Sequence, residues 1–315
     1  MSKIREIGMK YVFLAAACVS ILAVLLICLF LFANGIPAIA EIGVFDFLLG
    51  EKWQPLNDVF GIFPMIIGSI YVTAGSLIIG VPIGILCAVY MACYCPKKLY
   101  KVLKPAIDLL AGIPSIVYGF FGLVVIVPLI QDLSGTSGKG VLTASILLGI
   151  MILPTIISVS ESAIRAVPEH YNEGALALGA TKERSVFRVI LPAAKSGILA
   201  GIVLGIGRSI GETMAVSMVA GNQRIIPTGL FSGVRTLTAN IVIEMGYAAD
   251  LHREALIATG VVLFVFILII NLSFSALKNH DKAARIQKKE LRRNKKLQKA
   301  QKKQAELSLT QEREG

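Results

Sequence analysis

The chain has 315 residues, of which 55% are hydrophobic and 16% are charged, and its mean hydropathy is +0.75. This composition is too apolar for a soluble domain and is typical of a polytopic membrane protein. The net charge of +11 is concentrated at one end: residues 278–315 contain 13 Lys and Arg against 5 Asp and Glu, and the remainder contains 18 against 15. The charge therefore excludes nucleic-acid binding as a role for the whole protein.

Six apolar runs are long enough to cross a bilayer, which requires about 20 residues each. They predict an all-α membrane domain over residues 11–277, preceded by a short N-terminus (1–10) and followed by a basic tail (278–315). The first run is much longer than the apolar core of a signal peptide, so we expect it to be retained as a span. The expected spans are 11–33, 63–93, 107–130, 141–159, 197–220 and 255–277.

Lys and Arg are concentrated in alternate loops, which predicts the orientation of the chain. The N-terminus, the loop after the second run, the loop before the fifth run and the tail are basic, so we expect them to be cytoplasmic. The opposite loops, 34–62 and 131–140, contain one Lys each and should face outward. Segment 222–254 fits least well because it contains three arginines, and its apolar stretch 241–245 suggests a partly embedded hairpin.

Between the fourth and fifth runs, segment 161–192 predicts a short helical hairpin. Pro168 suits the first helical position, and Glu173 then lies near the positive end of the helix dipole. Gly179 suits a left-handed turn, and Thr181 suits the N-cap of a second helix. Two short helices that meet at a glycine form a compact knob for a groove on a partner protein. The alternative is an ordinary solvated amphipathic loop.

The hairpin resembles the EAA loop of ATP-binding-cassette importer permeases, whose pattern is Glu-Ala-Ala, three residues, Gly, nine residues, Ile-x-Leu-Pro. This chain departs from the pattern by Gly for Ala and by Val for Ile. The resemblance implies a six-helix MetI-like permease whose loop docks onto a separate ATPase subunit. It implies that ATP is used by that subunit. This chain itself is expected to bind no nucleotide or other cofactor, because its nearest approach to a phosphate loop, GTSGKG over residues 135–140, lacks the first glycine and the final Ser or Thr. The matching positions are Glu173, Gly174, Ala175, Gly179, Val189, Leu191 and Pro192.

The fifth run carries two charges, Arg208 and Glu212. A charge at bilayer depth costs at least roughly 2.5–3.5 kcal/mol, so such residues usually face a bundle interior or a substrate path. In one continuous helix they lie one turn apart and can form an ion pair. That pair either locks the bundle or belongs to an oxyanion path, since a guanidinium offers a planar fork of donors. Within an arc of about 80° lie Gly197, Gly201, Gly205, Arg208 and Glu212, with Ser209 and Thr213 beside them. The three glycines suit close helix packing.

The run GRSIGETMAVSMVAGN over residues 207–222 resembles the C-type permease subunits of bacterial phosphate-specific transport systems. LLAGIPSIVYGF (109–120) and ALALGAT (175–181) support the resemblance, which covers all six runs but not the tail. In that family the arginine and glutamate of this helix are implicated in phosphate passage, a role that passes to Arg208 and Glu212. The implied partners are an A-type permease subunit, a pair of ATPase subunits and an external phosphate-binding protein, at the bacterial cytoplasmic membrane.

Two alternatives remain open at this point. The first is a permease for another oxyanion, such as sulfate or molybdate, because those importers share the EAA loop. The second is a channel or secondary transporter that needs no ATPase. Co-purification with an ATPase distinguishes the second, and uptake of phosphate in the presence of sulfate distinguishes the first.

Other conspicuous residues are expected to be structural. Pro114 and Pro154 are expected inside the third and fourth spans, where they would kink the helix, and a gating hinge is the alternative. Asp108 is expected at a helix start beside Lys104 rather than in a transport site. The tail is expected to be a solvated extension that contacts anionic lipid.

The cysteines and histidines show no metal-ligand spacing. The cysteines are expected to be buried small hydrophobes rather than redox or metal-binding residues. These residues are Cys18, Cys28, Cys87, Cys93 and Cys95, and His170, His252 and His280.

Overall fold

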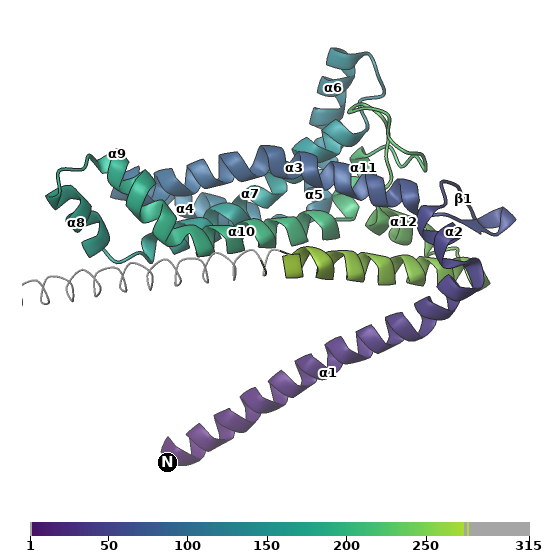
Figure 1. Cartoon of the computed structure of the whole chain (residues 1–315), viewed down its shortest axis with the longest axis horizontal. Helices are drawn as coiled ribbons and strands as arrows, with labels where there is room; N and C mark the ends of the chain where they lie inside the picture. The colour runs from purple at the N-terminus through teal and green to yellow at the C-terminus, as the bar shows by residue number, and fades with distance from the viewer. Residues whose placement is uncertain (1, 274–275, 277–315) are drawn as a thin grey trace, which may run out of the picture. The chain divides into compact units, whose positions relative to one another are not determined.

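A computed structural model describes residues 2–273 and residue 276, with side chains from Glu6 onward. The chain divides into two compact units, Met1–Ile267 and Leu268–Gly315. The first unit holds all the labelled elements of Figure 1, which are helical except for one short pair of strands. The predicted basic tail, 278–315, lies outside the described residues.

The N-terminal part of the first unit is one long helix followed by a compact turn region. Helix α1 (Ser2–Ile42) ends at Gly43, whose φ of +95° allows the chain to turn directly into α2 (Val44–Leu49). Strands β1 (Trp53–Gln54) and β2 (Val59–Phe60) pair antiparallel around the single turn η1 (Pro55–Asn57), with Trp53 opposite Phe60. We call β1, η1 and β2 the external hairpin, because it lies in the loop predicted to face outward.

Three long helices, α3 (Phe63–Val89), α7 (Val141–Arg165) and α10 (Leu191–Gly211), pack side by side (Figure 1). Their contacts depend on small residues. A Cβ at Gly80 of α3 would lie 2.8 Å from the side chain of Ile152, and one at Gly84 would lie 2.8 Å from Ile156. These approaches allow the backbones to come close, which is how helices gain packing energy in a lipid environment. Pro154 lies inside α7, as predicted.

The predicted third span is wrong in its first part. Residues 97–112 form a separate helix, α4 (Lys97–Gly112), and Pro114 lies in the break before α5 (Ser115–Phe121). Ile113 is extended with ψ 127° because a residue that precedes proline is pushed out of the helical region. The span itself runs from α5 through a π-helical turn, η3 (Gly122–Ile126), into α6 (Val127–Ser134). Pro114 therefore separates two helices instead of kinking one.

The predicted cytoplasmic hairpin is present as α8 (His170–Ala177), the turn at Gly179 and α9 (Lys182–Ser185). Its second limb continues without interruption through a π-helical turn, η4 (Val186–Ile190), into α10. A similar π-helical turn, η2 (Tyr90–Tyr94), ends α3. Helix α10 is followed by α11 (Met214–Val219), α12 (Leu237–Glu244) and a final helix, Asp250–Ser273.

Six helices among the described residues are long and apolar enough to cross a membrane, which confirms the predicted number of spans and a multi-pass membrane protein. The expectation that the cysteines are buried is wrong: Cys18 is exposed and the other four are partly exposed. An apolar side chain can face lipid without cost, so apolarity does not predict burial in a membrane helix. The six helices are Glu6–Ile42, Phe63–Tyr94, Ser115–Ser134, Val141–Arg165, Lys182–Gly211 and Asp250–Ser273.

Candidate functional site

The helix that carries the two charges is broken between them. Helix α10 ends at Gly211, and Glu212 is extended with φ −71° and ψ 129°, so the predicted continuous helix over 197–220 is wrong. Local side chains favour the break. The Glu212 carboxylate accepts a hydrogen bond from the backbone N–H of Ala215 at 3.2 Å, which caps the first turn of α11. The Thr213 hydroxyl donates to the Gly211 carbonyl at 3.2 Å.

The ion pair that Arg208 and Glu212 could form in one continuous helix is absent: none joins them in the part of the chain that the structure describes. Arg208 is half-buried in the last turn of α10, and its Nη1 donates a long hydrogen bond, 3.5 Å, to the hydroxyl of Thr155 in α7. Among the described residues, Thr155 is the only hydrogen-bond partner of this guanidinium. Most donors of the fork therefore remain available to another ligand.

The small residues of α10 face α7. A Cβ at Gly197 would lie 2.3 Å from Ala163, one at Gly201 would lie 3.1 Å from Ser160, and one at Gly205 would lie 3.0 Å from Ile156. Arg208 continues this face by reaching Thr155, whereas Glu212 leaves it at the end of the helix.

The hydroxyls of Ser209 and Thr213, which flank the two charged residues, have different surroundings. The Ser209 hydroxyl is buried and lies 2.8 Å from that of Ser76 in α3, so it is used inside the bundle. Thr213 is half-buried at the break.

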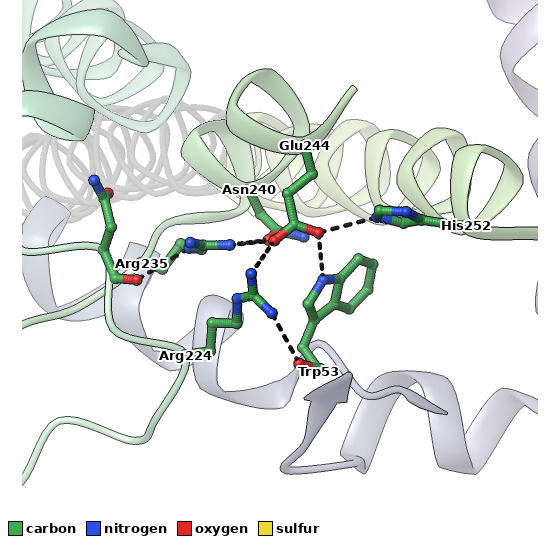
Figure 2. Close-up of polar contacts among 7 residues, drawn as sticks. Trp53, Arg224, Arg235, Asn240, Glu244 and His252 are labelled. Atoms are coloured by element: carbon green, nitrogen blue, oxygen red, sulfur yellow. Dashed lines mark hydrogen bonds and ion pairs between the residues drawn. The ribbon is translucent and has the colours of Figure 1, made fainter. Parts of the chain in front are cut away.

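A buried carboxylate, Glu244 at the end of α12, gathers polar side chains from distant segments (Figure 2). Its Oε1 lies 2.8 Å from Nη2 of Arg224 and accepts a hydrogen bond from Nη1 of Arg235. Its Oε2 accepts a hydrogen bond from the indole Nε1 of Trp53 at 2.7 Å and lies 3.0 Å from Nε2 of His252. We call the following residues the Glu244 cluster: Trp53, Arg224, Arg235, Asn240, Glu244 and His252.

The Glu244 cluster joins the external hairpin to α12. Nη1 of Arg224 also donates to the backbone carbonyl of Trp53 at 3.3 Å, and Arg235 donates to the amide oxygen of Asn240 at 3.0 Å. The Glu244 side chain is fully buried and that of Arg235 is 8% exposed. Burial alone would raise the pKa of Glu244. The hydrogen bonds from Trp53 and Arg235, the charge of Arg224 and the contact with His252 outweigh it and hold that pKa below its usual value.

The Glu244 cluster was not predicted from the sequence. Its one sign in the sequence was the presence of three arginines in segment 222–254, which the distribution of positive charge places outside. Arg224 and Arg235 act there as partners of a buried carboxylate rather than as markers of a cytoplasmic loop. The chain's single tryptophan, which belongs to the same cluster, carried no pattern that linked it to Glu244.

A second buried carboxylate, Glu161 in α7, ties α4 to the bundle. Lys104 lies 3.5 Å from Glu161 and 3.3 Å from Asp108, and the Tyr100 hydroxyl donates to Glu161 at 3.0 Å. Arg165 pairs with the same carboxylate. Asp108 is paired with Lys104 as predicted, but it lies well inside α4 and not at a helix start, because Pro105 is accommodated within that helix.

The hairpin turn has a specific local geometry. Gly179 has φ +82°, its N–H donates to the carbonyl of Leu176 at 2.9 Å, and the N–H of Ala180 donates to Ala175 at 3.1 Å. These two bonds form the Schellman motif that ends a helix at a left-handed residue. The Thr181 hydroxyl then accepts from the N–H of Arg184 at 3.3 Å and caps α9, as predicted.

The hairpin presents apolar side chains at its surface. Leu178, at the turn, is 90% exposed, and Leu176 and Phe187 are also exposed. Glu173 and Gly174 lie on the exposed surface of α8, and Val189 is half-buried in η4. Leu191 and Pro192 form the first turn of α10. An apolar tip on a rigid turn is a feature of protein interaction sites.

The chain is similar to known proteins over most of its length. The family model described as "Binding-protein-dependent transport system inner membrane component" matches residues 80–280. The "Probable ABC transporter permease protein YqgH" of Bacillus subtilis is 38% identical over 88% of this chain and 93% of its own length. The "Phosphate transport system permease protein PstC" of Mesorhizobium japonicum is 37% identical over 76% of this chain and 80% of its own length.

Solved structures agree on the fold. A chain of the inward-facing MetNI methionine ABC transporter matches with a TM-score of 0.55 and 20% identity, over 72% of this chain and 98% of that chain. At this identity the likeness concerns the fold alone. The predicted all-α, MetI-like fold is confirmed.

Proposed function

Because the chain belongs to the family of binding-protein-dependent transport system inner membrane components, we propose that it is a permease subunit of an ATP-driven importer of inorganic phosphate. The observation that carries the proposal is Arg208, a half-buried guanidinium at the end of α10 that uses one of its donors on Thr155. A guanidinium binds tetrahedral oxyanions through two parallel hydrogen bonds. Relatives named as phosphate transport permeases identify which oxyanion to test first.

Glu212 is proposed to select the anion. Phosphate near neutral pH keeps at least one proton that a carboxylate can accept, whereas sulfate keeps none and would leave the half-buried carboxylate of Glu212 unpaired. One carboxylate oxygen of Glu212 caps α11 through Ala215, and in this proposal the other accepts the proton of the ligand. We also assign Ser209 and Thr213 to the edge of this path. The contact of Ser209 with Ser76 favours a supporting role for Ser209.

The cytoplasmic hairpin is proposed to dock onto the ATPase. The exposed Leu178 and Leu176 beside the rigid turn at Gly179 are the surface that supports this assignment. The coupling positions are Glu173, Gly174, Ala175, Gly179, Val189, Leu191 and Pro192. In this proposal the permease performs no covalent chemistry and transmits movement between the ATPase and the anion path.

The proposed assembly contains this chain, an A-type permease subunit, two ATPase subunits and an external phosphate-binding protein. The chain lies in the bacterial cytoplasmic membrane with both termini in the cytoplasm, and the basic tail, 278–315, contacts anionic lipid. The permease domain is 11–277 and the ATPase-docking loop is 161–192.

The proposal is tested by uptake of radiolabelled phosphate into cells that express the whole transport complex in place of their own phosphate importers. We expect ATP-dependent uptake that excess unlabelled phosphate abolishes and excess sulfate or molybdate leaves intact. If excess sulfate or molybdate, but not excess phosphate, abolishes the uptake, a permease for another oxyanion is favoured. Phosphate uptake that persists with an inactive ATPase would favour a channel or secondary transporter.

A further inference from the structure

The break between α10 and α11 leaves the backbone carbonyl of Glu212 without its usual helical partner, and α12 supplies a replacement. The hydroxyl of Thr238 donates to this carbonyl at 3.0 Å. In a continuous helix the same carbonyl would accept from the N–H four residues on. Thr238 is 7% exposed, so water does not readily take over this bond. The carbonyl of Glu212 therefore depends on a side chain that lies 26 residues further along the chain.

The donor is oriented by a short chain of hydroxyls. Thr236 accepts a hydrogen bond from the N–H of Ala239, and its own hydroxyl lies 3.1 Å from that of Thr238. Each hydroxyl has one proton. Since Thr238 gives its proton to Glu212, the proton between the two threonines must come from Thr236. The first turn of α12 thus points a fixed donor at the break.

Helix α12 is held at both ends. At its start, the N–H of Leu237 donates to the hydroxyl of Ser69 in α3 at 3.0 Å. At its end, Glu244 is fixed by the Glu244 cluster, which includes Trp53 of the external hairpin. A shift of α12 would break contacts at both ends, so the position of Thr238 is set by Ser69 of α3 and by the Glu244 cluster.

The alternative to the break between α10 and α11 is one continuous helix. A continuous helix over 197–220, which the sequence alone favours, would place Arg208 and Glu212 one turn apart, where opposite charges attract. That pairing would occupy the guanidinium that the proposed function assigns to the anion. In the broken form Glu212 caps α11 and Thr238 satisfies the Glu212 carbonyl, so most donors of Arg208 stay available beside its contact with Thr155.

We propose that α12 is a latch on the anion path: through Thr238 it holds the α10–α11 break open and keeps Arg208 available to the anion. Thr238 is a positioning residue, since it acts through the backbone of Glu212 and does not touch the anion. Release of α12 allows residues 212–214 to rewind, and Glu212 then pairs with Arg208. The role of Arg208 in this inference rests on the proposed function. The existence of a broken and a continuous state of the helix does not depend on it.

The test compares Thr238→Val, which removes the donor at nearly constant volume, with Thr238→Ser, which keeps it. Thr228→Val is the matched control, because Thr228 is exposed in the same segment and its hydroxyl faces Ser232. Spin labels on unnatural side chains at Leu204 and Met214, both exposed, report the distance across the break in the assembled transporter. In a continuous helix these two positions are about 15 Å apart along the axis.

We expect Thr238→Val to move the label distance toward the value for a continuous helix. Uptake should fall about threefold to tenfold, because the loss of one buried hydrogen bond shifts a conformational equilibrium by about this factor. Thr238→Ser and Thr228→Val should match the wild type in both measurements. An unchanged label distance in Thr238→Val overturns the latch, even if uptake falls. A changed distance with normal uptake overturns its link to the anion path. If the wild type imports no phosphate, the proposed function fails while the label distances still decide the latch.

Discussion

The indole N–H of Trp53 donates a 2.7 Å hydrogen bond to the buried carboxylate of Glu244, 191 residues further along the chain. The bond connects the external hairpin to α12, and the same carboxylate is held by Arg224 and Arg235 (Figure 2). The external hairpin, α12 and the break at Glu212 are consequently one connected structure.

Removal of the Glu244 side chain should destabilise the protein strongly. Glu244→Ala leaves Arg235 buried without its carboxylate, which costs about 3–5 kcal/mol in comparable buried pairs. Thermal unfolding of the purified protein in detergent measures the loss. Glu254→Ala is the control, because Glu254 is exposed in the next helix. Equal melting temperatures for the two variants would contradict the structural importance of the Glu244 cluster.

The Glu244 cluster should also make stability depend on pH. The pKa of Glu244 is raised by burial but lowered more by Trp53, Arg235, Arg224 and His252, so it lies below the ordinary value of 4.5. A depressed pKa contributes stability that is present above pH 4.5 and is lost as the pH falls through the pKa of the folded state.

Glu244→Gln removes this titration, so acid unfolding of the wild type and of Glu244→Gln measures the contribution. We expect the stability difference between the two proteins to shrink as the pH falls below 4.5. A difference that stays constant from neutral pH into strong acid would show that Glu244 does not titrate in this way.

Replacement of Arg208 by Lys should impair transport without unfolding the protein. Lys keeps the charge but loses the planar fork, so uptake should fall by about tenfold or more if the anion is bound by two parallel hydrogen bonds. Stability should change by less than about 0.5 kcal/mol, because the contact of Arg208 with Thr155 is long.

Radiolabelled phosphate uptake and thermal unfolding, measured on the same preparations, separate the two effects of Arg208→Lys. Arg253→Lys, at an exposed position, is the matched control. Full uptake by Arg208→Lys would mean that the fork is not used. A large loss of stability would mean that Arg208 has a structural role.

A polar residue at the tip of the α8–α9 hairpin should uncouple the permease from the proposed ATPase subunit. Leu178 is 90% exposed beside the turn at Gly179, so Leu178→Ser removes apolar contact area without disturbing the fold. We expect weaker co-purification with the ATPase and lower uptake, at an unchanged amount of protein in the membrane. Thr136→Val, on the exposed loop that precedes α7, should leave both unchanged. Normal co-purification of Leu178→Ser would contradict docking at this tip.

Features governed by neighbours in the sequence could be predicted from the sequence by itself. The six spans follow from uninterrupted apolar length, and the hairpin follows from a glycine that accepts positive φ and a threonine that caps the next turn. The break at Pro114 was also encoded locally, since proline displaces the residue before it, although the sequence analysis placed that proline inside a helix.

The state of the Arg208–Glu212 segment depends on the tertiary structure as well as on the local caps at Glu212 and Thr213. A helical repeat predicts a pair one turn apart, and it contains no information on Thr238, which approaches from another segment and satisfies the carbonyl of Glu212. The Glu244 cluster was hidden for the same reason: Trp53, Arg224 and Glu244 come from segments that share no periodicity. A buried charge is stable only where its partners meet it, and that meeting is set by the packing of distant elements. Local patterns therefore determined the helices and the turn of the hairpin. The break in the charged helix has local caps as well, at Glu212 and Thr213, and the tertiary structure adds the hydrogen bond from Thr238 that satisfies the exposed carbonyl.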